Sequence, residues 1–217
     1  MINADRNRFI KQHVELYGEE LFLVSITKKS KKLSKVDLLK NLSSKVDIDL
    51  SFDKKNINSK VVFGSGDPNA DLLIVGESPG DYEVEYNKPF LGNSGKLLDK
   101  ILNAIGYSRS ANVYFTYLIK FKIDGFRYPL NSEINKFIPL LKKQIEIIEP
   151  KMIVGLGKVV GKSLVNENLS MDLLRSKVHS FSSCPLKITY SPDILLQHQS
   201  LKKLAWEDFQ FIRDFVK

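Results

Sequence analysis

The sequence predicts an α/β protein, a three-layer α/β/α sandwich with a central, mostly parallel four-stranded sheet. Short apolar segments alternate along the chain with longer segments of helical periodicity, which is the pattern of parallel strands joined by helices. The first apolar segment, residues 72–75, is apolar at every position, as in a strand buried on both faces. At 217 residues and 43% hydrophobic content, the chain is long enough to bury one core.

Each strand candidate is short, rich in apolar residues and followed by turn residues. Gly76 and the dipeptide Pro79-Gly80 end the first candidate, and Ser191-Pro192 ends the last. The four candidates are residues 72–75, 112–119, 151–156 and 188–190, and residues 61–63 are a further short strand before them.

The helix candidates carry apolar side chains at three- and four-residue spacing. Asn93 and Ser94 are expected to cap a helix that starts near Gly95 and ends at Gly106, and Ser132 is expected to cap the longest helix. These helices are predicted at about residues 95–105, 132–148, 159–164 and 201–215.

The first 45 residues have a different composition from the rest. Helical periodicity is present in residues 5–25, and a basic, serine-containing run follows at 28–35. A short helix is expected at 36–42, and a polar, irregular connection at 43–60. The basic run is either a solvated linker or a nucleic-acid-binding arm, and we favour the linker. We therefore expect a helical N-terminal extension with a basic linker at 1–45 and the main domain at 46–217.

Composition narrows the functional classes. A single cysteine excludes an intrachain disulfide and a Cys-ligated zinc or iron–sulfur site, and only three histidines disfavour a His-based metal site, so we expect no cofactor. No signal-peptide pattern and no apolar run of about 18 residues is present, so we expect a soluble, cytoplasmic protein without a membrane partner. The net charge of +8 suits a polyanionic partner. We expect a monomer.

Polar residues follow the predicted strands, at the end of the sheet where ligands bind in open α/β folds. Glu77 leaves the first strand on a tight turn, ahead of a loop that contains Phe90. Gly157 and Lys158 open a helix whose backbone N–H groups could bind a phosphate, although Gly157 could equally serve packing. Lys120, Lys122 and Arg127 form a basic segment after the second strand that could contact phosphates or simply be exposed.

These stretches, in their order and spacing, resemble the family 4 uracil-DNA glycosylases. The resemblance implies an α/β/α sandwich that flips uracil out of DNA and hydrolyses its glycosidic bond, a hydrolase of base-excision DNA repair. It implies that Glu77 orients the water, that Phe90 stacks on the base, and that Ser78, Gly80 and Glu83 help to form the base pocket. The stretches that carry it are residues 76–80, 88–92, 95–100, 113–120, 150–157, 189–196 and 205–208.

The chain departs from that family at its functional positions. Tyr117 stands where the family has an asparagine that reads the uracil edge, and Ser191 stands where it has a histidine facing the uracil carbonyl. Phe121 holds one of four positions that usually carry cluster cysteines. Tyr117 cannot present the paired donor and acceptor of an amide and could fill the pocket, and Ser191 is a shorter, neutral donor.

Two hypotheses follow. The first is a glycosylase-like protein that binds DNA and excises a deaminated base with weakened catalysis, using Glu77 and Ser191. The alternative is a non-catalytic DNA-binding or scaffold module that kept the fold. A third hypothesis, an enzyme acting on a nucleotide or another small phosphorylated ligand, has less support. Fold resemblance alone does not separate them.

Overall fold

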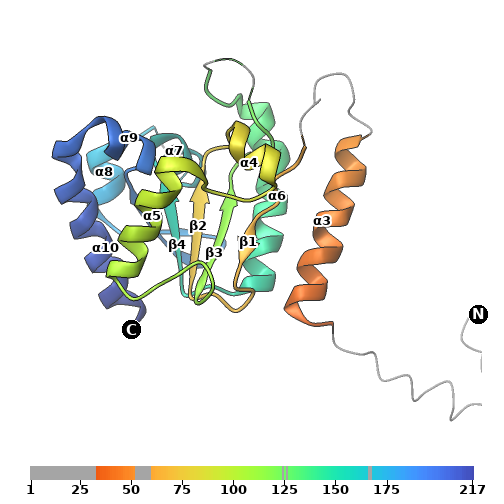
Figure 1. Ribbon diagram of the computed structural model, residues 1–217, viewed down its shortest axis with the longest axis horizontal. Coiled ribbons are helices and arrows are strands. Elements are labelled where there is room, and N and C mark those ends of the chain that lie inside the picture. The colour runs from red at the N-terminus through yellow and green to blue at the C-terminus, as the bar shows by residue number, and fades with distance from the viewer. Residues whose placement is uncertain (1–32, 52–59, 124, 126, 166–167) are drawn as a thin grey trace, which may run out of the picture. The chain divides into compact units, whose positions relative to one another are not determined.

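The computed structural model describes residues 33–51, 60–123, 125, 127–165 and 168–217 (Figure 1). Residues Lys35–Lys217 form one compact unit. The helix predicted at 5–25 and most of the basic run at 28–35 lie outside the described residues. Among the described helices, none is long and apolar enough to cross a membrane.

The four predicted strands form the parallel centre of the sheet. They are β2 (Leu72–Gly76), β3 (Val113–Tyr117), β4 (Met152–Leu156) and β6 (Cys184–Thr189), and β2, β3 and β4 are buried at every position because helices cover both faces. The strand order is β1-β3-β2-β4-β6-β5. The α/β/α class is therefore confirmed.

The sheet has six strands and not the four that we predicted. The two additional strands, β1 (Ser65–Gly66) and β5 (His179–Phe181), pair antiparallel at the edges. Both are too short and too polar to give an apolar run, so the sequence does not reveal them. The strand predicted at 61–63 is wrong: that segment is irregular, although the Val62 N–H donates to the Lys120 carbonyl (2.7 Å).

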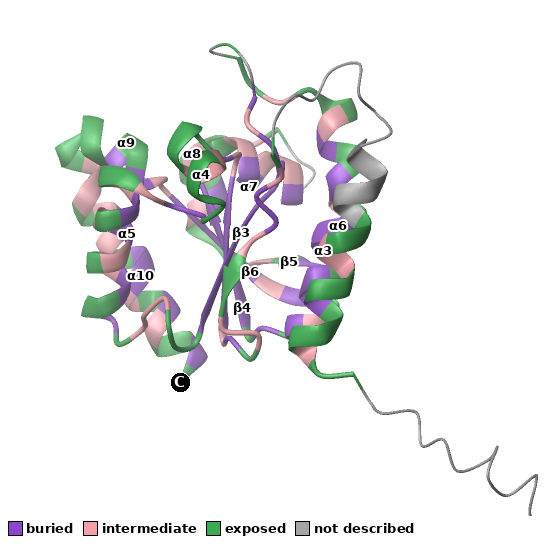
Figure 2. Cartoon of the chain, turned by 45° about the vertical axis from the view of Figure 1, so that its right-hand side comes forward, coloured by how far each residue is buried: buried purple, intermediate pink, exposed green. Residues whose placement is uncertain are grey.

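Helices cover both faces of the sheet, and the buried residues concentrate between the layers (Figure 2). One face packs against α5 (Gly92–Ala104) and α10 (Lys202–Val216), through side chains such as Leu98, Leu102 and Phe209. The other face packs against α6 (Asn131–Ile148), α7 (Lys158–Val165) and α8 (Met171–Ser176).

Helix α3 (Lys35–Ser51) is longer than predicted and includes half of the segment expected to be irregular. Leu39 joins the core, and Lys35 Nζ donates to the Ile148 carbonyl (2.8 Å) and pairs with Glu149 (2.9 Å) at the end of α6. The domain boundary predicted at residues 45 and 46 therefore falls inside a helix that packs on the main domain.

The remaining elements lie near the carboxyl ends of the parallel strands. They are α4 (Asp81–Tyr86), α9 (Pro192–Gln197) and a short 3-10 helix, η1 (Gln199–Leu201), none of which was predicted. Helix α5 begins at Gly92 and not near Gly95, because Gly92 adopts a left-handed φ of 65° that turns the chain into the helix.

Candidate functional site

A pocket of about 1000 Å³ opens at the carboxyl ends of the parallel strands. Its walls come from the turn after β2, from α4, from the Phe90 loop, from the end of β3 and from the starts of α7 and α9. The structure brings most of the predicted site residues together in this lining: Glu77, Ser78, Gly80, Glu83, Phe90, Tyr117, Gly157, Lys158 and Ser191.

Tyr117 and Phe90 stack on each other inside the pocket. Their ring centroids are 4.9 Å apart at an interplanar angle of 28°, and the Phe90 N–H donates to Tyr117 Oη (2.8 Å). Gly76 permits this arrangement, because a Cβ atom there would lie 2.7 Å from the Phe90 ring and 2.9 Å from the Tyr117 ring. One face of Phe90 and its backbone donor are therefore occupied by the protein's own side chain.

The Phe90 loop is held in a strained conformation. Phe90 has a φ of 53°, which is unfavourable for a residue with a Cβ atom. Arg109 donates to the carbonyls of Pro89 (2.8 Å) and Phe90 (2.5 Å) and pairs with Asp99 (2.6 Å). The sequence analysis missed Arg109, since an arginine in a connecting segment carries no signal of such a contact.

Glu83 links the two loops that form the pocket. One of its carboxylate oxygens accepts the Gly80 N–H (3.0 Å) and the other accepts the Leu91 N–H (2.7 Å). We predicted a contact with the base, but both oxygens are bound to backbone. Glu83 therefore positions the turn after β2 relative to the Phe90 loop.

Glu77 lies in the pocket near a second carboxylate that the sequence analysis missed. Burial raises the pKa of Glu77 above its usual value, and the charge of Asp193 raises that pKa further. Asp193 lies in the first turn of α9 and accepts a hydrogen bond from the Ser94 hydroxyl. Glu77 and Asp193 are therefore close enough for their charges to interact, and Glu77 takes up a proton at a higher pH than an exposed glutamate does.

Ser191 is the N-cap residue of α9 and lies next to Gly157, at the end of β6. A Cβ atom on Gly157 would lie 3.6 Å from Ser191 Cβ, so the two turns are in close contact. The Gly157 N–H donates to the Thr189 carbonyl (2.8 Å). This N–H is therefore engaged within the fold and is not available to a phosphate.

The structure contradicts the phosphate contact predicted for Lys120. This side chain is fully buried, and its Nζ donates to Thr116 Oγ1, to the Tyr117 carbonyl (2.7 Å) and to Gln144 Oε1 (2.7 Å). Burial lowers the pKa of Lys120 well below its usual value. The prediction is wrong for this residue, because a lysine inside the core cannot reach DNA.

The other two cations of the basic segment are on the surface. Lys122 pairs with Asp81 in the first turn of α4 (2.5 Å), and Arg127 pairs with Glu133 in the first turn of α6 (2.7 Å). These ion pairs hold Lys122 to α4 and Arg127 to α6.

The cysteine content does not fit a four-cysteine iron–sulfur cluster. The chain has one cysteine, Cys184, which is buried in the core, where burial raises the pKa of its thiol to about 11. Phe121 is also buried and packs against Phe137, with ring centroids 5.6 Å apart. An apolar contact thus occupies the position where the resemblance implies a cluster ligand.

Comparisons with known proteins agree with this architecture. The model of the Uracil DNA glycosylase superfamily matches residues 63–210. A type-4 uracil-DNA glycosylase of Sulfurisphaera tokodaii is 35% identical over 73% of this chain and 76% of its own length. A type-4 uracil-DNA glycosylase of Archaeoglobus fulgidus is 30% identical over 81% of this chain and 90% of its own length.

A relative of a different kind also matches. A DNA polymerase of Bacillus phage SP01 is 29% identical over 74% of this chain, but the match covers 17% of the polymerase. Because the family model covers most of the chain and the type-4 enzymes align over most of their length, the chain belongs to the uracil-DNA glycosylase superfamily and is similar to its type-4 members.

Proposed function

We propose that this protein binds DNA and that its hydrolysis of the bond between uracil and deoxyribose is strongly weakened. The observation that carries the proposal is the stacking of Tyr117 on Phe90. The resemblance assigns Phe90 the role of stacking on the flipped base, and a base cannot occupy the face that a tyrosine ring already covers. Tyr117 also accepts a hydrogen bond from the Phe90 N–H, which is therefore not available to a base.

The chemistry of the bond cleavage supports weak catalysis. Breaking the bond leaves negative charge on the departing uracil, which the pocket must stabilise while Glu77 orients the attacking water. Losing one preorganised donor to such a developing anion typically costs about 10²–10³ in rate. Ser191 provides a shorter and uncharged donor in place of an imidazole, so the anion receives less stabilisation.

The second candidate is a DNA-binding module without catalysis. Two observations favour it: the Tyr117 ring in the pocket and the similarity to part of a phage DNA polymerase. In that case the same fold would bring DNA to a partner, and Glu77 would stabilise its own turn instead of orienting a water.

The test is release of uracil from single-stranded and double-stranded oligonucleotides, together with binding of the same oligonucleotides. We expect binding that weakens steeply with salt, by roughly 0.9 log units per log unit of salt for each duplex phosphate neutralised. We expect slow uracil release that Glu77→Ala abolishes. Binding without any release would favour the module, and absence of DNA binding at low salt would contradict both candidates.

A further inference from the structure

Two strongly exposed tyrosines stand at the mouth of the pocket. Tyr82 on α4 is 65% exposed, and Tyr128 on the segment between β3 and α6 is 75% exposed. Both line the pocket, although they come from segments that are far apart in the sequence. Rings this exposed contribute little to the core and are available to a ligand that enters the pocket.

Hydrogen bonds and ion pairs restrain described residues next to both tyrosines. Glu83 ties α4 to the Gly80 and Leu91 N–H groups (3.0 and 2.7 Å), and Lys122 ties the segment after β3 to Asp81 (2.5 Å). Arg127 donates to the Tyr128 carbonyl (3.1 Å) and pairs with Glu133 (2.7 Å). Rings on a fixed backbone lose less conformational entropy on binding than rings on an unrestrained segment.

The pocket that these rings line also contains cations that could contact phosphates. Three acidic residues lie on α4: Asp81 is paired with Lys122, Glu83 is bound to backbone N–H groups, and Glu85 is exposed. Two further carboxylates, Glu77 and Asp193, line the pocket. Lys158 and Lys162 line the same pocket, and the whole chain carries a net charge of +8. Exposed aromatic rings beside cations are the combination with which proteins hold single-stranded nucleic acid, by stacking on bases while cations contact the phosphates.

We propose that Tyr82 and Tyr128 form a stacking platform for unpaired bases, so that the protein prefers single-stranded DNA to duplex DNA. The proposal rests on the DNA binding proposed above and adds the form of DNA that is bound. An unpaired base can lay its face on a tyrosine ring, whereas the bases of a duplex are stacked on each other. Stacking does not require the face of Phe90, so the platform remains usable while Tyr117 covers that face.

The experiment compares three labelled probes of equal length by fluorescence anisotropy: a thymidine single strand, a duplex, and a single strand of abasic residues. The variants are Tyr82→Ala with Tyr128→Ala, and Tyr82→Phe with Tyr128→Phe. Because each stacked base is worth about 1–3 kcal/mol, we expect the double alanine variant to bind the thymidine strand at least about tenfold more weakly. The phenylalanine variant, which keeps both rings, should bind like the parent.

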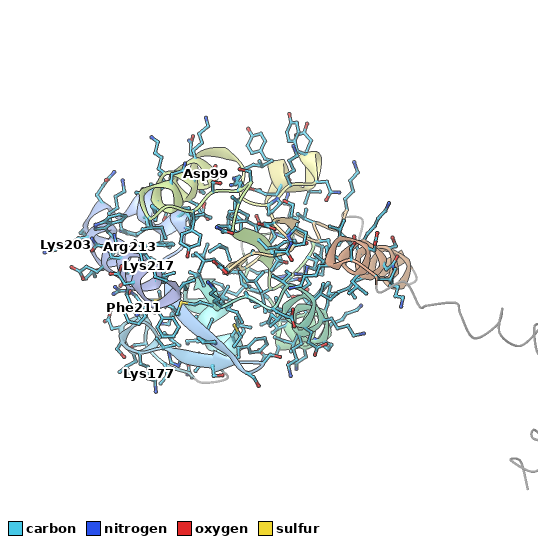
Figure 3. All side chains as sticks on the ribbon, turned by 90° about the horizontal axis from the view of Figure 1, so that it is seen from below. Asp99, Lys177, Lys203, Phe211, Arg213 and Lys217 are labelled. Carbon is cyan, nitrogen blue, oxygen red and sulfur yellow. The ribbon has the colours of Figure 1, made fainter. Side chains whose placement is uncertain are left out.

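A matched control exists on the opposite side of the molecule. Phe211 and Phe215 on α10 are 42% and 48% exposed, and their tilted rings lie 5.8 Å apart. Neither residue lines the pocket. Figure 3 shows Phe211 with Arg213 and Lys217, another aromatic and basic surface, seen from the end of the sheet opposite α4. Phe211→Ala with Phe215→Ala removes the same number of exposed rings and should leave binding of the thymidine strand unchanged.

The outcomes separate this inference from the proposed function. Loss of thymidine binding in the double alanine variant, with abasic and duplex binding unchanged, supports the platform. Three outcomes would overturn the platform while DNA binding stands. The double alanine variant could lose as much affinity for the abasic strand as for the thymidine strand, or the α10 control could lose as much affinity as the double alanine variant. The parent could also bind duplex as tightly as single strand. If the parent binds none of the three probes, the proposed DNA binding itself fails.

Discussion

The ends of β3 and β6 face the same pocket, and each carries a residue that differs from the type-4 pattern. At β3 the difference adds volume, because the Tyr117 ring covers Phe90 and its hydroxyl accepts the Phe90 N–H. At β6 the difference shortens the side chain, because Ser191 ends at a hydroxyl beside Gly157 where the family has an imidazole. We propose that the first change blocks the stacking face of Phe90 and that the second provides a weaker donor, so correcting either position alone should recover little activity.

The two strand ends are also supported differently. Near Tyr117, Lys120 donates to three neutral oxygens, and none of these hydrogen-bond partners is a carboxylate. Below Ser191, Asp208 is buried between Arg175 (2.7 Å), the Thr189 hydroxyl (2.7 Å) and Lys187 (3.4 Å). The β6 end therefore depends on buried charge, and the β3 end on hydrogen bonds of a lysine that burial pushes toward its neutral form.

The largest effect is expected from Asp208→Ala. Removing the carboxylate leaves Arg175 and Lys187 partly buried without their counter-charge, which typically costs about 3–5 kcal/mol. Urea unfolding followed by circular dichroism measures the loss. Asp214→Ala, which breaks an exposed ion pair with Arg213 on the same helix, is the control and should leave the midpoint unchanged. Equal midpoints for both variants would show that the β6 end does not depend on the buried carboxylate.

A smaller effect is expected from Lys120→Met. Three oxygens lose a donor, and each buried group left unsatisfied costs about 1–3 kcal/mol of folding stability. The cost of burying the ammonium disappears as well. The net loss of stability should therefore be smaller than that of Asp208→Ala.

The same variant should change how stability depends on pH. Since the pKa of Lys120 is lowered in the folded state, the unfolded chain binds a proton that the folded chain lacks, in the range between the lowered value and about 10.4. The stability of the parent relative to Lys120→Met should therefore rise as the pH rises through that range. A difference that does not change with pH would mean that Lys120 is charged in the fold.

The smallest effect concerns the carboxylates of the pocket. In a variant with measurable uracil release, the rate should rise with pH as Glu77 loses its proton, above the usual range for a glutamate, because its pKa is raised by burial and by Asp193. Asp193→Asn removes the charge that raises the pKa of Glu77 further, so the rise in rate should begin at a lower pH. Burial still keeps the pKa of Glu77 above the usual value of a glutamate. An unchanged limb would assign the titration to another group.

Much of the fold could be predicted because it depends on local patterns. The four apolar runs became the four parallel strands, whereas the edge strands contain too few apolar residues to be recognised. The position of Lys120 could not be predicted, because its burial depends on Gln144, 24 positions away, and a lysine beside a turn resembles an exposed cation. Arg109 and Asp193 were missed since their partners, the Phe90 carbonyl and the Ser94 hydroxyl, come from other elements. The chemical differences at Tyr117 and Ser191 were visible in sequence, but the stacking on Phe90 required the structure.

Single-turnover uracil release by Tyr117→Asn with Ser191→His, compared with the parent and with Ser191→His alone, tests whether Tyr117 blocks the base. The double change uncovers Phe90 and restores an edge-reading amide and an imidazole donor. We expect a gain of at least about 10² over the parent, and little gain from Ser191→His alone because the tyrosine still covers Phe90. A folded double variant that releases uracil no faster than the parent, or a full gain from Ser191→His alone, would contradict the claim that Tyr117 blocks the base.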